Sequence, residues 1–174
     1  MTRSKKQLLQ DAYFSLGKTM PASEITIQKL IDEANISRST FYYYFEHMLE
    51  FTIYLENELL KPMQNFLFTQ DAEKNRAQII TALTYFQEKK DAVYLLRYAP
   101  QNELLAKIDR LLNRYLNQFL KSKGLEIDSF QRFVICSTFA SLIIPSTIHT
   151  EGTPTEQSDH MIRLILRLLQ LEII

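Results

Sequence analysis

The stretch from Thr26 to His47 constrains the fold of this chain more than any other feature. Its first half carries apolar residues at positions i, i+3, i+4 and i+7, which is the pattern of one buried helical face: Ile27, Leu30, Ile31 and Ala34. A second apolar pair with helical spacing, Phe41 and Phe45, follows after a gap that leaves room only for a turn. The pattern predicts two short helices joined by a tight turn.

Three polar residues fit the ends of these helices. The hydroxyls of Thr26 and Ser37 can each accept a free backbone N–H at the start of a helix. Asn35 stands at the turn, and asparagine tolerates the left-handed backbone conformation better than most residues with a side chain. Helix, tight turn and second helix form the helix-turn-helix motif, whose second helix enters the major groove of DNA. We therefore expect a DNA-binding motif here.

The second helix directs hydrogen-bonding side chains away from its buried face: Arg38, Ser39, Thr40, Tyr42, Tyr43 and Tyr44. Such a surface is typical of DNA contact, although an exposed aromatic helix can also bind a protein partner. The helix and turn that precede it favour DNA. Arg38 is the best candidate to contact a base, because its guanidinium matches O6 and N7 of guanine.

The rest of the chain also follows helical periods. It contains only three glycines and five prolines, most of them between apolar stretches, and no alternation typical of strands. We predict an all-α fold with about nine helices, at residues 3–18, 26–34, 37–44, 47–68 (interrupted at Pro62), 73–89, 91–98, 100–121, 128–144 and 156–173. The segment 128–144 is apolar almost all round, which predicts burial on several sides. The expected domains are a helix-turn-helix domain, 1–46, and a helical ligand-binding and dimerisation domain, 47–174.

The composition of the chain indicates whether it folds and in which compartment we expect it. The hydrophobic content of 46% predicts a folded chain, and the single cysteine, Cys136, predicts a buried thiol in a reducing compartment. The N-terminus does not resemble a signal peptide, and no apolar stretch is long enough to span a bilayer. We expect a soluble cytoplasmic protein that does not contact membranes. The net charge is zero, and residues 1–48 hold six Lys or Arg against five Asp or Glu, which argues against strong non-specific binding of nucleic acid.

The last two predicted helices carry more apolar surface than one small helical domain covers. Pairing them with the same helices of a second copy would bury that surface in a twofold homodimer. The candidate interface residues are Phe130, Phe139, Ile143, Met161, Ile165, Leu168 and Leu169.

Aromatic residues in the C-terminal part allow two interpretations. Their helical spacing is typical of plain core, whereas the excess of tyrosines favours a cavity for a small apolar or aromatic ligand, because buried hydroxyls need partners. The candidate lining residues are Tyr54, Tyr85, Phe86, Tyr94, Tyr98, Tyr115, Phe119 and Phe133.

We expect no metal or other cofactor. His149, Glu151, Asp159 and His160 gather around one predicted loop, but their spacing matches no metal site, and a solvated loop explains them better. The sequence contains no phosphate-binding glycine loop, nucleophile elbow or zinc signature, so an enzyme is not expected.

The N-terminal region resembles the TetR family of bacterial transcriptional regulators. The residues that fit the family's helix-turn-helix pattern are Thr26, Leu30, Ile31, Ala34, Ile36, Ser37, Thr40, Phe41, Tyr42, Tyr44 and Phe45, and the run from Leu8 to Gly17 resembles its first helix. The match covers about the first 50 residues. The resemblance implies a homodimeric regulator, by default a repressor, that binds a pseudo-palindromic operator and responds to a small ligand.

The resemblance also implies roles for individual residues. Base edges or the adjacent sugar-phosphate would be contacted by Gln28, Arg38, Ser39, Thr40 and Tyr43. Phosphates would be held by Thr26, Ser37, Tyr42, Tyr44 and His47. Lys5 and Lys6 would approach the backbone or the minor groove, unless they form a solvated tail.

Two positions depart from the family pattern. Asn35 replaces the usual turn glycine, which is a mild change. Met48 replaces a lysine that usually contacts phosphate, and its loss predicts weaker binding and a flatter dependence on salt. This departure and the near-neutral charge motivate an alternative, a TetR-like adaptor or co-activator that acts mainly through a protein partner.

Overall fold

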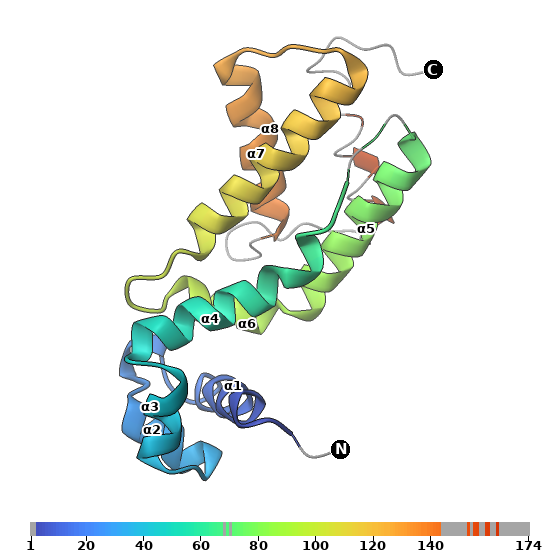
Figure 1. The fold of residues 1–174 in the computed structure, drawn as a ribbon. Coiled ribbons are helices and arrows are strands. Elements are labelled where there is room, and N and C mark those ends of the chain that lie inside the picture. The colour runs from blue at the N-terminus through green and yellow to red at the C-terminus, as the bar shows by residue number, and fades with distance from the viewer. Residues whose placement is uncertain are drawn as a thin grey trace. The chain divides into compact units, whose positions relative to one another are not determined.

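The structure, a computed structural model, describes residues 3–67, 69, 71–143, 153, 155, 156, 159, 160 and 163. This part of the chain contains eight α-helices and no strand, so the predicted all-α fold is confirmed (Figure 1). The helices are α1 Lys5–Leu16, α2 Ile27–Ala34, α3 Arg38–Tyr44, α4 Met48–Leu60, α5 Ala72–Glu88, α6 Lys90–Arg97, α7 Leu104–Lys123 and α8 Ser129–Ile143. Most of the ninth predicted helix, 156–173, lies outside the described residues.

The chain divides into two compact units. Unit 1 comprises Met1–Lys61 and Asp91–Leu105, and unit 2 comprises Pro62–Lys90 and Ala106–Ile174. The N-terminal helices therefore share a unit with α4 and α6, and each unit is built from two separate pieces of the chain. The boundary expected after residue 46 separates two domains by their function, whereas the two units here are defined by compactness. The functional boundary stays a prediction.

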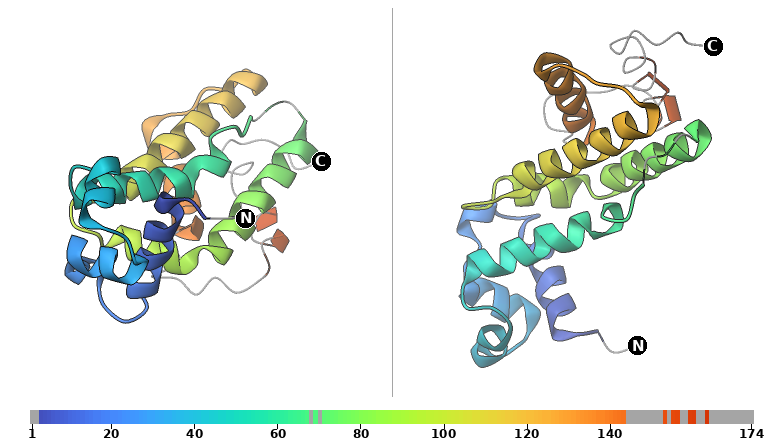
Figure 2. Two further views of the ribbon diagram at one scale, coloured as in Figure 1. Left: turned by 60° about the horizontal axis from the view of Figure 1, so that its bottom comes forward. Right: turned by 45° about the horizontal axis from the view of Figure 1, so that its top comes forward.

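Unit 1 is built around a core of large side chains from four helices. Leu9 and Tyr13 of α1, Leu30 of α2, Phe41 of α3 and Phe51 of α4 are all at most 1% exposed. The views in Figure 2 show α2 and α3 packed side by side. Three residues of the predicted apolar stripe of α2, Leu30, Ile31 and Ala34, are buried, and the fourth, Ile27, is half-buried.

Glycine at position 17 lets α1 end close to α6. The backbone of Gly17 has an ordinary right-handed conformation, with φ −62°. A Cβ atom there would lie 2.2 Å from Cδ2 of Leu95, a buried residue of α6. The glycine is therefore required for the close approach of two helices rather than for an unusual backbone angle.

The core of unit 1 also encloses a carboxylate. Glu56 of α4 is fully buried, and its Oε1 accepts the backbone N–H of Glu103, at 2.9 Å. The hydroxyl of Tyr13 is buried too and has no hydrogen-bond partner among the described residues. Burial, reinforced by the negative charge of Glu56, raises the pKa of Tyr13 to about 12.

Two prolines bear on helix boundaries. Pro62 lies in a 3-10 turn, Lys61–Met63, directly after α4, so the predicted interruption of a longer helix is confirmed. Pro100 was expected to start a helix, but α7 begins only at Leu104. The reason is Gln101, whose φ of 55° is left-handed and incompatible with a helix interior.

Unit 2 contains α5, α8 and most of α7. Its core includes Leu83 and Phe86 of α5, Ile108 and Leu112 of α7, and Ile135 of α8. In Figure 1, α8 follows α7 as its neighbour, and α8 also contacts α5. No helix in the described part of the chain is long and apolar enough to cross a membrane.

Among the described side chains of residues 128–144, only one face is buried, and burial on further sides stays a prediction that depends on the dimer. Phe130 and Phe133 of α8 are 72% and 66% exposed, whereas Ile135 and Cys136 are buried. An all-round apolar sequence therefore has one face in the core of unit 2 and another that the described residues leave uncovered.

Candidate DNA-binding surface

The helix pair α2–α3 begins at two hydroxyl caps. The side chain of Thr26 accepts the backbone N–H of Lys29, at 3.3 Å, and that of Ser37 accepts the N–H of Thr40, at 3.2 Å. Both predicted N-caps are confirmed. The Ser37 hydroxyl also lies 2.9 Å from Oγ of Ser39 and 2.7 Å from Oγ1 of Thr40, so three hydroxyls meet at the start of α3.

The turn between the helices has the predicted left-handed residue. Asn35 has φ 50° and ψ 52°, and its N–H donates to the carbonyl of Asp32. The N–H of Ile36 reaches back to the carbonyl of Ile31, at 3.1 Å. A hydrogen bond to the carbonyl five positions earlier is typical of a helix that ends at a left-handed residue. After this bond the chain turns into α3.

Aromatic packing anchors the inner side of α3. Phe41 is fully buried, and the ring centroids of Phe45 and Phe51 lie 5.7 and 6.1 Å from its own. Phe45 ends the helix in an extended conformation and packs 5.1 Å from Phe51. The predicted burial of Phe41 and Phe45 is confirmed, and these contacts give α3 a fixed orientation on α4.

The outer side of α3 is open to solvent. Arg38, Ser39, Tyr42 and Tyr43 are exposed, and Tyr43 is 81% exposed. The guanidinium carbon of Arg38 lies 5.9 Å from the ring centroid of Tyr42. Two neighbouring exposed rings, Tyr42 and Tyr43, thus lie beside an exposed guanidinium, and this grouping gives the face the character of a contact surface.

All twelve predicted DNA-contacting residues lie in unit 1. Nine of them are exposed, and Lys6, Thr40 and Tyr44 are half-buried. Gln28 on α2 donates from Nε2 to Oδ1 of Asp32, at 2.9 Å. His47 is the N-terminal cap residue of α4, without a side-chain cap bond.

Lys6 differs from its neighbour Lys5. Lys5 is exposed, whereas the ammonium nitrogen of Lys6 lies over the rings of Tyr44, Phe45 and Tyr54. This contact could not be predicted from the sequence, because it joins α1 to residues about 40 positions later.

The candidate ligand-pocket residues lie in both units. Tyr54, Tyr94 and Tyr98 belong to unit 1, and Tyr85, Phe86, Tyr115, Phe119 and Phe133 belong to unit 2. In unit 2, the hydroxyl of Tyr115 donates to the carbonyl of Met63, and Phe133 lines a pocket of about 300 Å³ between α7 and α8. Their joint role in ligand binding stays a prediction.

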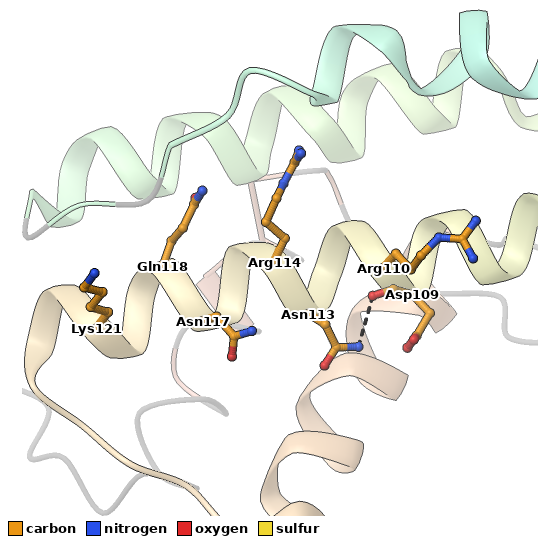
Figure 3. A pocket seen from close by; sticks show the side chains of 7 residues that line it. All are labelled: Asp109, Arg110, Asn113, Arg114, Asn117, Gln118 and Lys121. Carbon is orange, nitrogen blue, oxygen red and sulfur yellow. Dashed lines mark hydrogen bonds between the residues drawn. The ribbon is translucent and has the colours of Figure 1, made fainter.

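A larger pocket, of about 610 Å³, is open and is lined by residues with polar side chains. Its lining residues all come from α7: Asp109, Arg110, Asn113, Arg114, Asn117, Gln118 and Lys121. In Figure 3 the side chains of Arg114 and Gln118 point to one side of the helix, and those of Asn113 and Asn117 to the other. Arg114 also donates to the carbonyl of Gln64, at 2.9 Å. These polar groups do not converge on one ligand position.

The candidate dimer residues, and the loop residues that the sequence analysis judged unlikely to bind a metal, are described only in part. Phe130 is exposed on α8, whereas the side chains of Phe139, Ile143, Met161, Ile165, Leu168 and Leu169 lie outside the described part. His149 and Glu151 also lie outside it. Asp159 forms a bidentate ion pair with Arg76 of α5, with N–O distances of 2.6 and 3.1 Å, and this pairing holds the pKa of Asp159 below its usual range. No group of three potential metal ligands occurs among the described residues.

Comparisons with known proteins identify the fold. No protein-family model and no curated protein matches the chain. Among solved structures, one described as the dihydroxyacetone kinase operon activator DhaS matches with a TM-score of 0.66 and 14% identity, over 95% of this chain and 96% of that one. A TetR transcriptional regulator from Streptococcus agalactiae 2603V matches with a TM-score of 0.64 and 20% identity, over 92% of this chain and 93% of that one. The chain therefore has the helical fold of the TetR-type transcriptional regulators, as its N-terminal motif predicted.

Proposed function

We propose that this protein is a DNA-binding transcriptional regulator in which α3 enters the major groove. The observation that carries the proposal is the two-sided construction of α3. Phe41 and the Ser37 cap hold the helix in place, while Arg38, Ser39 and Tyr43 extend from it into solvent. A rigid helix with exposed hydrogen-bonding groups can contact base edges with little loss of conformational entropy in those groups.

We further propose that the protein acts as a homodimer on a pseudo-palindromic operator. The uncovered Phe130 on α8 supports a second copy as the partner. In such a dimer the two α3 helices would enter successive major grooves, about 34 Å apart along one side of the duplex. Repression is the default sign, by resemblance to the TetR family.

A small apolar or aromatic ligand in the helical domain would control the affinity for DNA. Such a ligand acts only if it binds more tightly to one arrangement of the dimer's two helix-turn-helix domains than to another arrangement. The support for this step is the set of aromatic residues in unit 2, from Tyr85 to Phe133.

The direct test is selection of duplexes from a random-sequence library by the purified protein, followed by affinity measurements at low salt. We expect a pseudo-palindromic consensus. Arg38→Ala should weaken binding and relax the preference at one base pair per half-site, by about 1–3 kcal/mol if the contact is to guanine. Lys18→Ala is the matched control, because Lys18 is an exposed cation of unit 1 outside the proposed surface. Absence of any consensus, with Arg38→Ala equal to the control, would contradict the proposal.

A second candidate function is an adaptor or co-activator that acts through a protein partner. The near-equal charges of residues 1–48 and the half-buried Met48 at the start of α4 favour it, as does the likeness to a protein described as an operon activator. Met48→Lys distinguishes the two functions. A weakened DNA binder should bind more tightly and gain about 0.9 in the magnitude of its salt slope per new phosphate contact, whereas an adaptor should not change.

A further inference from the structure

The first turn of α1 places a cation inside a group of aromatic rings. The Nζ atom of Lys6 lies 5.4 Å from the ring centroid of Tyr44, 5.3 Å from that of Phe45 and 4.9 Å from that of Tyr54. All three distances are within the range of about 6 Å in which the negative face of a ring attracts an ammonium group. One lysine therefore joins α1 to the end of α3 and to the middle of α4.

The rings that receive Lys6 also pack on one another. The centroids of Phe45 and Tyr54 are 5.3 Å apart, and Phe45 is only 3% exposed. Lys6 itself is half-buried, unlike the exposed Lys5 next to it. To bond a DNA phosphate, Lys6 would have to leave three favourable ring contacts, whereas Lys5 would leave none that the structure shows.

The contact between Lys6 and Tyr44 lies next to the exposed face of α3. The ring of Tyr44 meets that of Tyr43 edge to face, with centroids 4.8 Å apart and an interplanar angle of 82°. Tyr43 is the most exposed of the large apolar residues in the described part of the chain. A group that fixes the ring of Tyr44 therefore restricts the positions open to the ring of Tyr43.

We propose that Lys6 is a positioning residue for DNA recognition: its ammonium group holds Tyr44, Phe45 and Tyr54 together and so sets the orientation of Tyr43, and it does not bond phosphate itself. The consequence for DNA rests on the proposed function, whereas the placement of Lys6 among the rings does not. The two parts are therefore tested by separate measurements.

The placement is tested by NMR on the DNA-free protein. Ring currents should displace the ε-methylene protons of Lys6 upfield from those of Lys18, an exposed lysine of the same unit. Lys6→Met should shift the ring signals of Tyr44 and Tyr43, and Lys18→Met should leave them in place. Equal ε-methylene shifts for Lys6 and Lys18 in the wild-type protein would overturn the proposal, whether or not Lys6→Met folds.

The role is tested by the salt dependence of binding to a duplex selected by the wild-type protein. Lys6→Met should weaken binding about threefold to tenfold through the lost ring contacts, with a salt slope equal to that of Lys18→Met. Lys6→Arg should restore the affinity, because a guanidinium also binds ring faces. A slope smaller by about 0.9 in Lys6→Met alone would show a phosphate contact and overturn the proposal. If the wild-type protein selects no duplex, the proposed function fails, and the NMR comparison still decides where Lys6 lies.

Discussion

Single polar side chains decide where the helices of unit 1 begin, turn and end. Thr26 and Ser37 cap α2 and α3, and Asn35 supplies the left-handed residue between them. Each such cap contributes about 1 kcal/mol. These residues act on neighbours within three or four positions, so their roles could be predicted from the sequence.

Other polar groups in the same unit depend on distant partners. Glu56 is bonded by the N–H of Glu103, and Lys6 is held by rings beyond position 43. No local pattern indicates these contacts, although Glu56 does follow the buried Thr52 and precede the buried Leu60 by four residues each. That spacing places Glu56 on an inner face of α4 and could have identified it as buried.

Tyr13 should make the protein sensitive to alkaline pH. Its folded-state pKa of about 12 exceeds the usual value of 10, so between these pH values the unfolded chain loses a proton that the folded chain keeps. Stability should therefore be unaffected below pH 10 and fall as pH rises towards 12, by up to about 3 kcal/mol from this group. Urea unfolding of wild type and Tyr13→Phe at about pH 8 and about pH 11 measures the difference.

Because the two proteins differ only at position 13, the difference between their responses to pH isolates the contribution of Tyr13. At the lower pH the phenylalanine variant should be as stable as wild type or more stable, because it removes a buried hydroxyl without a hydrogen-bond partner among the described residues. An equal loss of stability in both proteins on going to the higher pH would contradict the assignment.

At the scale of whole helices, order and approximate bounds could be predicted, since the apolar stripes of α1, α2, α4 and α5 repeat at helical spacing. Helix starts and ends that depend on the path of the backbone could not be predicted. The late start of α7 depends on the left-handed Gln101, a residue type with little preference for that conformation. An excess of apolar surface on α8 could also be predicted, but an apolar sequence does not reveal which of its faces meets another helix of the same chain.

The packing of α1 against α6 should depend on the absence of a side chain at position 17. In Gly17→Ala the new Cβ would lie 2.2 Å from Cδ2 of Leu95, so the leucine must change rotamer or the helices must separate. We expect a loss of about 1–2 kcal/mol in the free energy of unfolding, measured in urea.

Leu95→Ala provides the matched test of this contact. It should lose stability by itself, because Leu95 is buried, but adding Gly17→Ala to it should cost little more. Fully additive losses in the double variant would mean that the clash is not the cause.

For the molecule as a whole, the exposed Phe130 of α8 bears on the oligomeric state. If α8 pairs with a second copy, Phe130→Glu places a charge in an apolar interface and should raise the dimer dissociation constant at least tenfold, by about 1.4 kcal/mol or more. Analytical ultracentrifugation over a range of concentrations measures this change.

Leu67→Glu is the control for the loss of an exposed apolar side chain in unit 2, because Leu67 is 59% exposed and lies outside the predicted interface. It should leave the dissociation constant unchanged. A wild-type protein that sediments as a monomer at all concentrations would contradict both the dimer and the proposed recognition of paired half-sites.

The bond between Glu56 and the N–H of Glu103 has a practical consequence for protein engineering. A fragment that stops after α4 would retain a carboxylate in its interior and lack the amide that accompanies it. Transplanting the N-terminal helices onto another regulator would therefore require residues 91–105 as well, joined by a new connection in place of residues 62–90. A chimaera that carries only residues 1–61 should express poorly, while one that carries both pieces should fold.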